Sequence, residues 1–217
     1  SAASDVYKRQ SEEMLGLLTG SGHEIVDSEE EAEAIVINTC CFIHDAKEES
    51  VNTILEMAEY KKTGKCKALV VTGCMAQRYK EEITQEIPEV DAVLGTTSYG
   101  DIVKALNEVQ AGHVFQEFRD INELPEDSGR RVLTTGGHFG YLKIAEGCDK
   151  HCTYCIIPSL RGSFRSVPEE RLLAQAEYMA SQGVKELILV AQETTVYGTD
   201  LYGRKTLHIL LKKLCQI

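Results

Sequence analysis

The sequence AIVINT, residues 34–39, is an almost continuous apolar run that is rich in β-branched side chains. Such a run is typical of a strand that is buried on both faces, as strands in parallel sheets are. Similar runs follow at residues 68–72 and 90–94. Segments with helical periodicity alternate with them, at residues 14–18, 44–62, 79–87 and 99–110. This alternation predicts an α/β fold whose first half is a doubly wound parallel sheet.

A second series of strands and helices follows a polar segment, residues 117–138, which we interpret as an interdomain linker that can include a short hairpin. Beyond it, strands are predicted at residues 141–145 and 186–191. Helices are predicted at residues 166–182 and 207–214. Ser166 and Glu169 form a capping-box pattern at the start of the first of these helices.

The chain has 217 residues, a formal net charge of −11 and eight cysteines. No apolar run reaches the roughly 18 residues that a membrane-spanning helix needs, and the first residues lack the apolar core of a signal peptide. We therefore expect a cytoplasmic protein, in a reducing compartment where clustered cysteines bind metals or do chemistry rather than form disulfides. The negative charge argues against a general electrostatic grip on nucleic acid and favours a basic protein partner.

Three of the cysteines, Cys148, Cys152 and Cys155, form the pattern CxxxCxxC directly after a predicted strand. One loop thus offers three soft thiolates, which suit iron–sulfur ligation. A 4Fe–4S cluster held by three thiolates keeps one iron open, and an open iron can chelate the amino and carboxylate groups of S-adenosylmethionine. The alternative is a structural zinc site with His151 or Cys215 as fourth ligand, although zinc sites usually pair CxxC with a second CxxC or with HxxxH.

Five further residues are candidates for contact with that cofactor. Tyr154 directly precedes the last cysteine, so we expect it to pack against the adenine. Arg161 follows the cysteines and can contact the carboxylate of the cofactor or of the substrate, or can be an exposed charge, as can Lys143. Gln192 and Glu193 end a predicted strand, which places them for a polar contact with the cofactor ribose.

Two stretches resemble the radical-SAM methylthiotransferase family. The first runs from YLKIAEGC at residues 141–148 through IIPSLRG at residues 156–162 to Arg165 and Ser166. The second, AQETTVYG at residues 191–198, is similar to the RimO-type pattern AQ-D/E-TTxYG, where the tRNA-modifying relatives carry a GQNV-like segment. The resemblance extends from about residue 11 to the end of the chain.

The resemblance implies an enzyme that adds a methylthio group to the β-carbon of an aspartate in the small-subunit ribosomal protein S twelve. It implies two 4Fe–4S clusters and S-adenosylmethionine as cofactors. One cluster would generate a deoxyadenosyl radical, an auxiliary cluster would supply sulfur, and a second S-adenosylmethionine would supply the methyl group. The implied partners are the ribosomal protein or the small ribosomal subunit and an electron donor, with no membrane and no direct nucleic-acid contact for this chain.

By the same resemblance, residues 11–116 are the methylthiotransferase domain that holds the auxiliary cluster, and residues 139–217 are a truncated radical-SAM domain that opens a TIM-like barrel. Cys40 and Cys74 match two ligands of the auxiliary cluster. Both follow predicted strands, at the carboxyl ends where the ligands of parallel sheets gather. The third ligand should precede Met14, but residues 1–10 contain no cysteine.

We therefore expect residues 1–10 to be a foreign, unstructured segment in place of the native first strand, and the auxiliary cluster to bind weakly or not at all. Cys41 is not expected to replace the third ligand, because neighbouring side chains of an extended segment point to opposite faces. The family's later barrel strands and its C-terminal TRAM-like domain are expected to be absent. The remaining alternatives are a tRNA adenosine methylthiotransferase, which AQETTVYG and the net charge oppose, and a non-catalytic zinc-binding scaffold.

Overall fold

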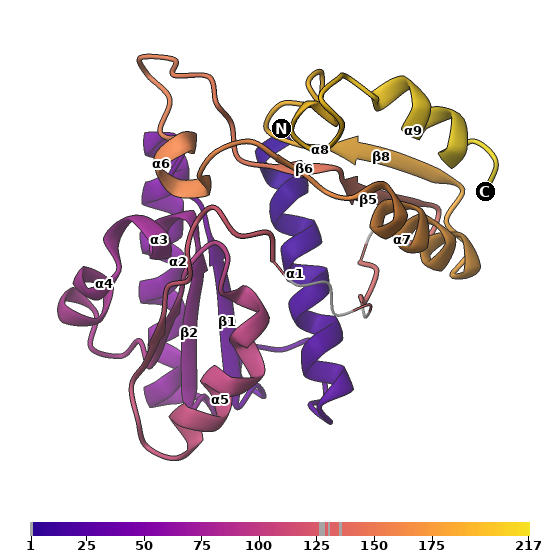
Figure 1. Ribbon diagram of the computed structural model, residues 1–217. Helices are drawn as coiled ribbons and strands as arrows, with labels where there is room; N and C mark the ends of the chain where they lie inside the picture. Colours follow the sequence, from indigo (N-terminus) through magenta and orange to yellow (C-terminus); the bar gives the residue numbers. More distant parts are fainter. Residues whose placement is uncertain (1, 126–128, 130, 135) are drawn as a thin grey trace. The chain divides into compact units, whose positions relative to one another are not determined.

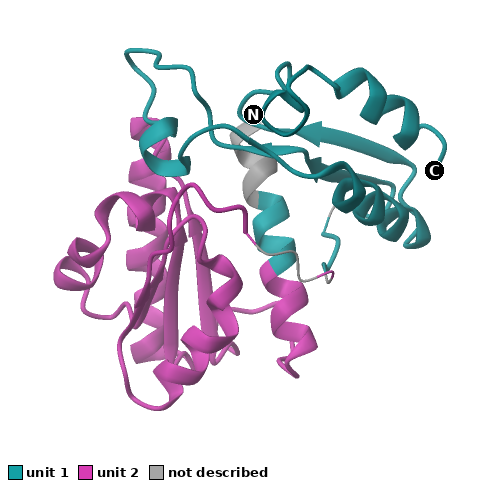
Figure 2. Ribbon diagram, viewed as in Figure 1, with its two compact units in different colours: residues 1–13, 131–217 teal, residues 14–130 magenta. Residues whose placement is uncertain are grey.

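The computed structural model describes residues 2–125, 129, 131–134 and 136–217, with side chains from residue 8 onward. The chain forms two compact units (Figure 2). The amino-terminal unit comprises residues 14–130, and the carboxyl-terminal unit comprises residues 1–13 together with residues 131–217. Among the described helices, none combines the length and the apolar character that a membrane span requires.

The amino-terminal unit is built on a parallel sheet of four strands that lie side by side in chain order (Figure 1). The strands are β1 (Ala34–Thr39), β2 (Ala68–Gly73), β3 (Ala92–Leu94) and β4 (Phe115–Glu117). The parallel α/β sheet predicted from the apolar runs is confirmed. Strand β4 was not predicted: it is only three residues long, none of them buried, so it gives no apolar run.

Helices cover both faces of this sheet. Met14 and Leu18 of α1 (Ala2–Gly20) and Ile102 of α5 (Ile102–Gln110) pack against Val70 and Leu94 on one face. Side chains alternate along a strand, so the buried odd-numbered residues of β1 and β2 point to the opposite face. Helix α2 (His44–Thr63), with buried Ile54 and Ala58, contacts these two strands.

The helix expected at residues 79–87 is placed differently in the structure. Helix α3 (Cys74–Tyr79) begins directly at the end of β2, and α4 (Glu81–Glu86) follows it. The two are separated at Lys80, whose φ of 42° lies in the left-handed region. The sequence prediction began too late because the run after Gly73 has no helical start signal. The short 3₁₀ helix η1 (Tyr99–Asp101) then leads into α5.

The carboxyl-terminal unit contains two short pairs of strands. Strands β5 (Phe139–Lys143) and β8 (Glu186–Val190) are parallel, and β6 (Ala145–Glu146) and β7 (Arg165–Ser166) are antiparallel. Its helices are α6 (Ile157–Arg161), α7 (Glu169–Ser181), α8 (Thr199–Tyr202) and α9 (Leu207–Leu214). In the described part of residues 118–138 there is no strand, and the part of the expected hairpin that falls on residues 126–128, 130 and 135 lies outside the described residues.

The predicted capping box at Ser166 and Glu169 is wrong. Helix α7 has Pro168 as its N-cap residue and no side-chain cap hydrogen bond. The Ser166 hydroxyl instead donates to Asp200 Oδ1 at 2.6 Å and accepts from the backbone N–H of Gly198 at 2.9 Å. The Ser166 hydroxyl thus makes a tertiary contact and not the helix cap that the local sequence pattern predicted.

The expectation that residues 1–10 are unstructured is also wrong for the described residues among them, because residues 2–10 form the first half of α1. The sequence has no glycine or proline before Gly16, so nothing interrupts a helix there. Arg9 and Glu13, one helical turn apart, form an ion pair of 2.5 Å, and both are almost fully buried. The foreign origin of this segment stays a prediction.

Candidate functional site

Cys148, Cys152 and Cys155 lie on one loop, residues 147–164, which we call the cysteine loop. The antiparallel pairing of β6 with β7 closes its base. Two further hydrogen bonds join its ends: the Cys148 N–H donates to the carbonyl of Gly162 at 3.1 Å, and the Phe164 N–H donates to Asp149 Oδ1 at 2.8 Å. A strand therefore precedes the cysteines and helix α6 follows them, as the sequence predicts.

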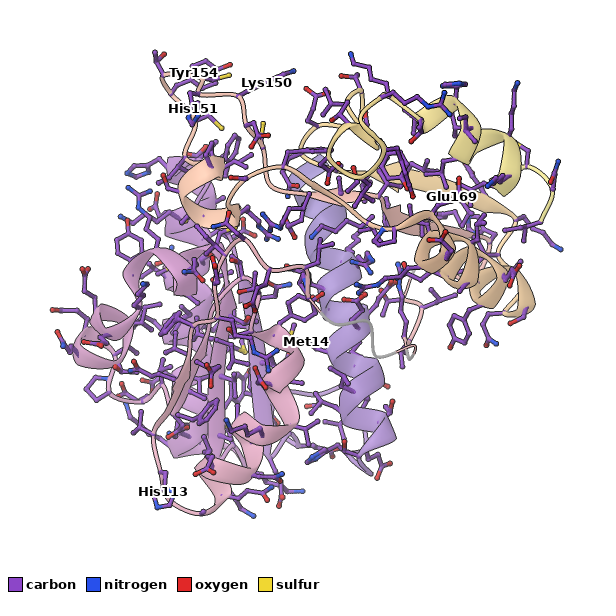
Figure 3. The ribbon with its side chains drawn as sticks, viewed as in Figure 1. Met14, His113, Lys150, His151, Tyr154 and Glu169 are labelled. Atoms are coloured by element: carbon purple, nitrogen blue, oxygen red, sulfur yellow. The ribbon has the colours of Figure 1, made fainter. Side chains whose placement is uncertain are left out.

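The three thiols differ in exposure. Cys152 is exposed, whereas Cys148 and Cys155 are half-buried, and the Cys155 N–H donates to the Cys152 carbonyl at 2.9 Å. Tyr154 is 88% exposed and, with His151, lies at the outer end of the loop (Figure 3). In the part of the chain that the structure describes, no three His, Cys, Asp or Glu side chains already converge as a metal site. The donor set nevertheless fits an iron–sulfur cluster, because one loop supplies three accessible soft ligands.

A buried carboxylate lies immediately before the cysteine loop. Glu146, 2% exposed, pairs with the ammonium of Lys143 and with Arg161 Nη1 at 3.3 Å. Burial acts to raise the pKa of Glu146, but the charges of Lys143 and Arg161 outweigh it and hold the pKa well below its usual range. Lys143 and Arg161 are therefore both buried, and the alternative that they are exposed surface charges is wrong. Glu146 itself was missed; the only signal was an acidic residue directly after a buried strand.

Gln192 and Glu193 follow β8 and face two different partners. Gln192 Nε2 donates to Glu146 Oε1 at 2.9 Å. Glu193 pairs with Lys150 of the cysteine loop and accepts from the Thr195 N–H at 3.0 Å. These hydrogen bonds, with that from Lys150 foremost, lower the pKa of Glu193 to about 2. The structure thus brings the end of β8 to the cysteine loop, and both residues predicted from sequence lie at this junction.

Cys40 and Cys74 follow directly after Thr39 and Gly73, which are register partners on the neighbouring strands β1 and β2. Cys74 is buried and Cys40 is half-buried. Position 73, directly before Cys74, requires glycine, because its φ is +97° and a Cβ there would lie 2.7 Å from Asn38 Oδ1. The sequence prediction that the two strands are neighbours is confirmed.

Cys41 joins this group of thiols, which the sequence did not predict. It is 3% exposed, and its pKa is raised to about 11, first by burial and then by the neighbouring thiols Cys74 and Cys40. The opposite-face argument assumed that the strand continues, but β1 ends at Thr39. The structure therefore places three thiols near the carboxyl ends of β1 and β2.

Comparison with known proteins matches two different families to the two halves of the chain. Residues 5–95 match the family described as uncharacterized protein family UPF0004, and residues 142–216 match the radical SAM superfamily. A ribosomal protein uS12 methylthiotransferase RimO from Lachnoclostridium phytofermentans is 63% identical over 207 residues, which is 95% of this chain and 47% of that protein.

Proteins of the same name show similar coverage. The one from Clostridioides difficile is 48% identical over 204 residues, 94% of this chain and 46% of its own length. The one from Clostridium botulinum (strain Eklund 17B / Type B) is 47% identical over 214 residues, 98% of this chain and 48% of its own length. The chain therefore spans about half the length of the curated relatives it matches.

Proposed function

The chain belongs to the radical-SAM methylthiotransferase family, and from this premise we propose that it is part of a RimO-type enzyme that adds a methylthio group to the β-carbon of an aspartate in ribosomal protein uS12. The observation that carries the proposal is the cysteine loop. Its three cysteines lie on one loop between a strand and a helix, at the end of a parallel strand pair. Active sites of βα barrels lie at this end of the strands.

Cys148, Cys152 and Cys155 would hold a 4Fe–4S cluster through their thiolates. When bound, such a cluster with one open iron supplies the electron that cleaves S-adenosylmethionine. Tyr154 offers an uncovered aromatic face for the adenine. Gln192 and Glu193 supply polar groups beside the cysteine loop. An ion pair between Lys150 of that loop and Glu193 connects the two segments.

Cys40 and Cys74 would supply two thiolate ligands to the auxiliary cluster from the ends of neighbouring strands. Soft thiolates suit iron–sulfur ligation, so the donor set fits this group.

The test uses the full-length protein, reconstituted with iron and sulfide without oxygen. We expect a brown protein that dithionite bleaches and that converts S-adenosylmethionine into methionine and 5′-deoxyadenosine. With ribosomal protein uS12 as substrate, mass spectrometry should find the methylthio group on an aspartate. The variant Cys148→Ala/Cys152→Ala/Cys155→Ala should lose the cleavage.

Three results would contradict the proposal. A colourless protein that retains zinc would indicate a scaffold. A methylthio group on tRNA with an unmodified aspartate would indicate a nucleic-acid substrate. Intact S-adenosylmethionine after reduction of the reconstituted protein would show that the protein does not carry out the proposed radical chemistry.

A further inference from the structure

Glu146 occupies the centre of a buried polar network in the carboxyl-terminal unit. Its carboxylate forms ion pairs with the Lys143 ammonium and the Arg161 guanidinium, and it accepts a hydrogen bond from the side-chain amide of Gln192. Lys143 and Arg161 are each 3% exposed, so these charges are compensated within the protein rather than by water. The network joins the strand before the cysteine loop, the helix that follows the cysteines and the end of β8.

This network determines which way the Gln192 amide faces. A carboxylate that pairs with two cations can only accept hydrogen bonds. Gln192 must therefore turn its NH₂ group toward Glu146, at 2.9 Å, and its carbonyl oxygen away from it. A neutral residue at position 146, such as glutamine, could donate as well as accept and would not impose this orientation.

The oxygen that results is buried and unused. Among the described residues, Gln192 Oε1 has no hydrogen-bond partner, and its accessible area is below 1 Å². A buried acceptor without a donor is costly, because it has lost its hydrogen bonds to water and has gained none within the protein. Its neighbour Glu193 is bonded to Lys150 of the cysteine loop, so the orphan oxygen lies at the junction where the proposed cofactor binds.

We propose that Glu146 is a positioning residue that fixes the Gln192 amide so that Oε1 accepts a hydrogen bond from S-adenosylmethionine. The inference rests on the proposed function. The cofactor offers three kinds of donor: the ribose hydroxyls, the adenine 6-amino group and the α-ammonium group of its methionine half. A purely structural Glu146 would hold the loop together but would not determine how Gln192 meets a ligand.

The test measures S-adenosylmethionine binding to the reconstituted full-length protein by equilibrium dialysis, with iron content and circular dichroism as checks on the fold. We expect Glu146→Gln to weaken binding about tenfold, as the loss of one well-formed hydrogen bond of about 1.4 kcal/mol does. The double variant Glu146→Gln/Gln192→Glu keeps one carboxylate beside the two cations and restores an acceptor at position 192. Binding by it should return to within about threefold of the parent protein.

Competition with fragments of the cofactor identifies the donor. If the donor to Gln192 lies on the nucleoside half, as a ribose hydroxyl or the adenine amino group, Glu146→Gln weakens binding of 5′-methylthioadenosine and leaves that of methionine unchanged. If the α-ammonium binds it, the pattern reverses. Glu177→Gln, on an exposed position of α7, is the matched control and should bind like the parent.

Unchanged S-adenosylmethionine binding in a folded, iron-loaded Glu146→Gln variant would overturn the proposal, as would a double variant that recovers nothing. Should Glu146→Gln not fold, Gln192→Leu removes the same oxygen and leaves the ion pairs of Glu146 intact, so unchanged affinity there also overturns it. Failure of the parent protein to bind S-adenosylmethionine is a separate result, which refutes the proposed function instead.

Discussion

Burial and two neighbouring thiols shift the protonation equilibrium of Cys41 in the same direction. Each of them disfavours the thiolate, so the pKa is raised to about 11 and the thiol stays protonated at neutral pH. At pH 8 only roughly one Cys41 in a thousand is a thiolate, which is the form that alkylating reagents attack. In the metal-free protein, iodoacetamide at pH 8 should therefore modify Cys152 and Cys215, which are exposed, and spare Cys41.

Peptide mass spectrometry checks this order of labelling. Cys41 should become reactive only when the pH approaches 11 or when the protein is unfolded in urea. Equal labelling of Cys41 and Cys215 in the folded protein at pH 8 would show that Cys41 is not buried among thiols.

Position 147, directly before the first cysteine of the loop, requires glycine because of its surroundings. Its φ is +76°, and a Cβ there would collide with the carbonyl of Ser163 and lie 2.6 Å from that of Gly162. Because both obstacles are backbone, Gly147→Ala must open the base of the cysteine loop. We expect a loss of about 2–4 kcal/mol in unfolding free energy and a failure of the loop to retain iron after reconstitution.

Gly183→Ala separates this collision from the strain of the backbone angle alone. Gly183 has φ +93° but nothing within 4 Å of its Cβ position. It should cost only about 1–2 kcal/mol and keep the iron of the cysteine loop. Chemical denaturation and iron analysis of both variants test this, and equal iron loading in the two would contradict it.

The sequence specifies some site residues better than others. The spacing of Cys148, Cys152 and Cys155 is local, so they could be predicted before the fold was known. The partners of Gln192 could not, because Glu146 lies 46 positions earlier in the chain and only the pairing of β5 with β8 brings the two together. The proximity of Cys41 to Cys40 and Cys74 could not be predicted either, because the point where β1 stops depends on the sheet and not on the local sequence.

On the scale of elements, α1 contributes Glu12 as a buried anchor of the carboxyl-terminal unit. The Glu12 carboxylate pairs with Arg131 Nη2 at 2.5 Å and accepts from the Thr134 N–H at 2.8 Å, and its side chain is 0% exposed. Removing one partner of a buried ion pair leaves the other charge uncompensated. Glu12→Ala should therefore lower the free energy of unfolding by about 3–5 kcal/mol.

Urea denaturation measures this cost, with Glu177→Ala on the exposed face of α7 as a control that should stay within about 0.5 kcal/mol of the parent. A Glu12→Ala variant as stable as that control would mean that α1 does not hold this contact in solution.

Elements with long, regular patterns were predicted to within a residue or two, and those that depend on tertiary contacts were not. Strand β1 and helix α9 have the bounds that their apolar patterns predict. Strand β4 exists because it pairs with β3, and its own residues, Phe-Gln-Glu, carry no strand signal. The first half of α1 was missed because its sequence has no apolar periodicity; its polar residues Arg9 and Gln10 are buried in the fold.

For the whole molecule, the balance of charge decides which partners this chain can attract. Lysine and arginine number 23 against 34 acidic residues, a formal net charge of −11. Phosphate contacts supply most of the affinity in non-specific nucleic-acid binding, and an acidic chain repels phosphates. A basic protein is attracted instead, and salt screens that attraction, since the Debye length falls from about 10 Å at 0.1 M to about 3 Å at 1 M salt.

We therefore expect this chain to bind polylysine at 0.05 M salt and to release most of it at 0.5 M, and not to bind single-stranded RNA at either concentration. Fluorescence anisotropy with labelled polylysine and a labelled oligonucleotide measures both, and polyglutamate serves as the like-charged control. RNA binding that weakens steeply with added salt would show that a local basic patch outweighs the net charge. The preference for a basic protein surface over a phosphate backbone, on which the choice between a ribosomal protein and a tRNA partly depends, would then lose its electrostatic support.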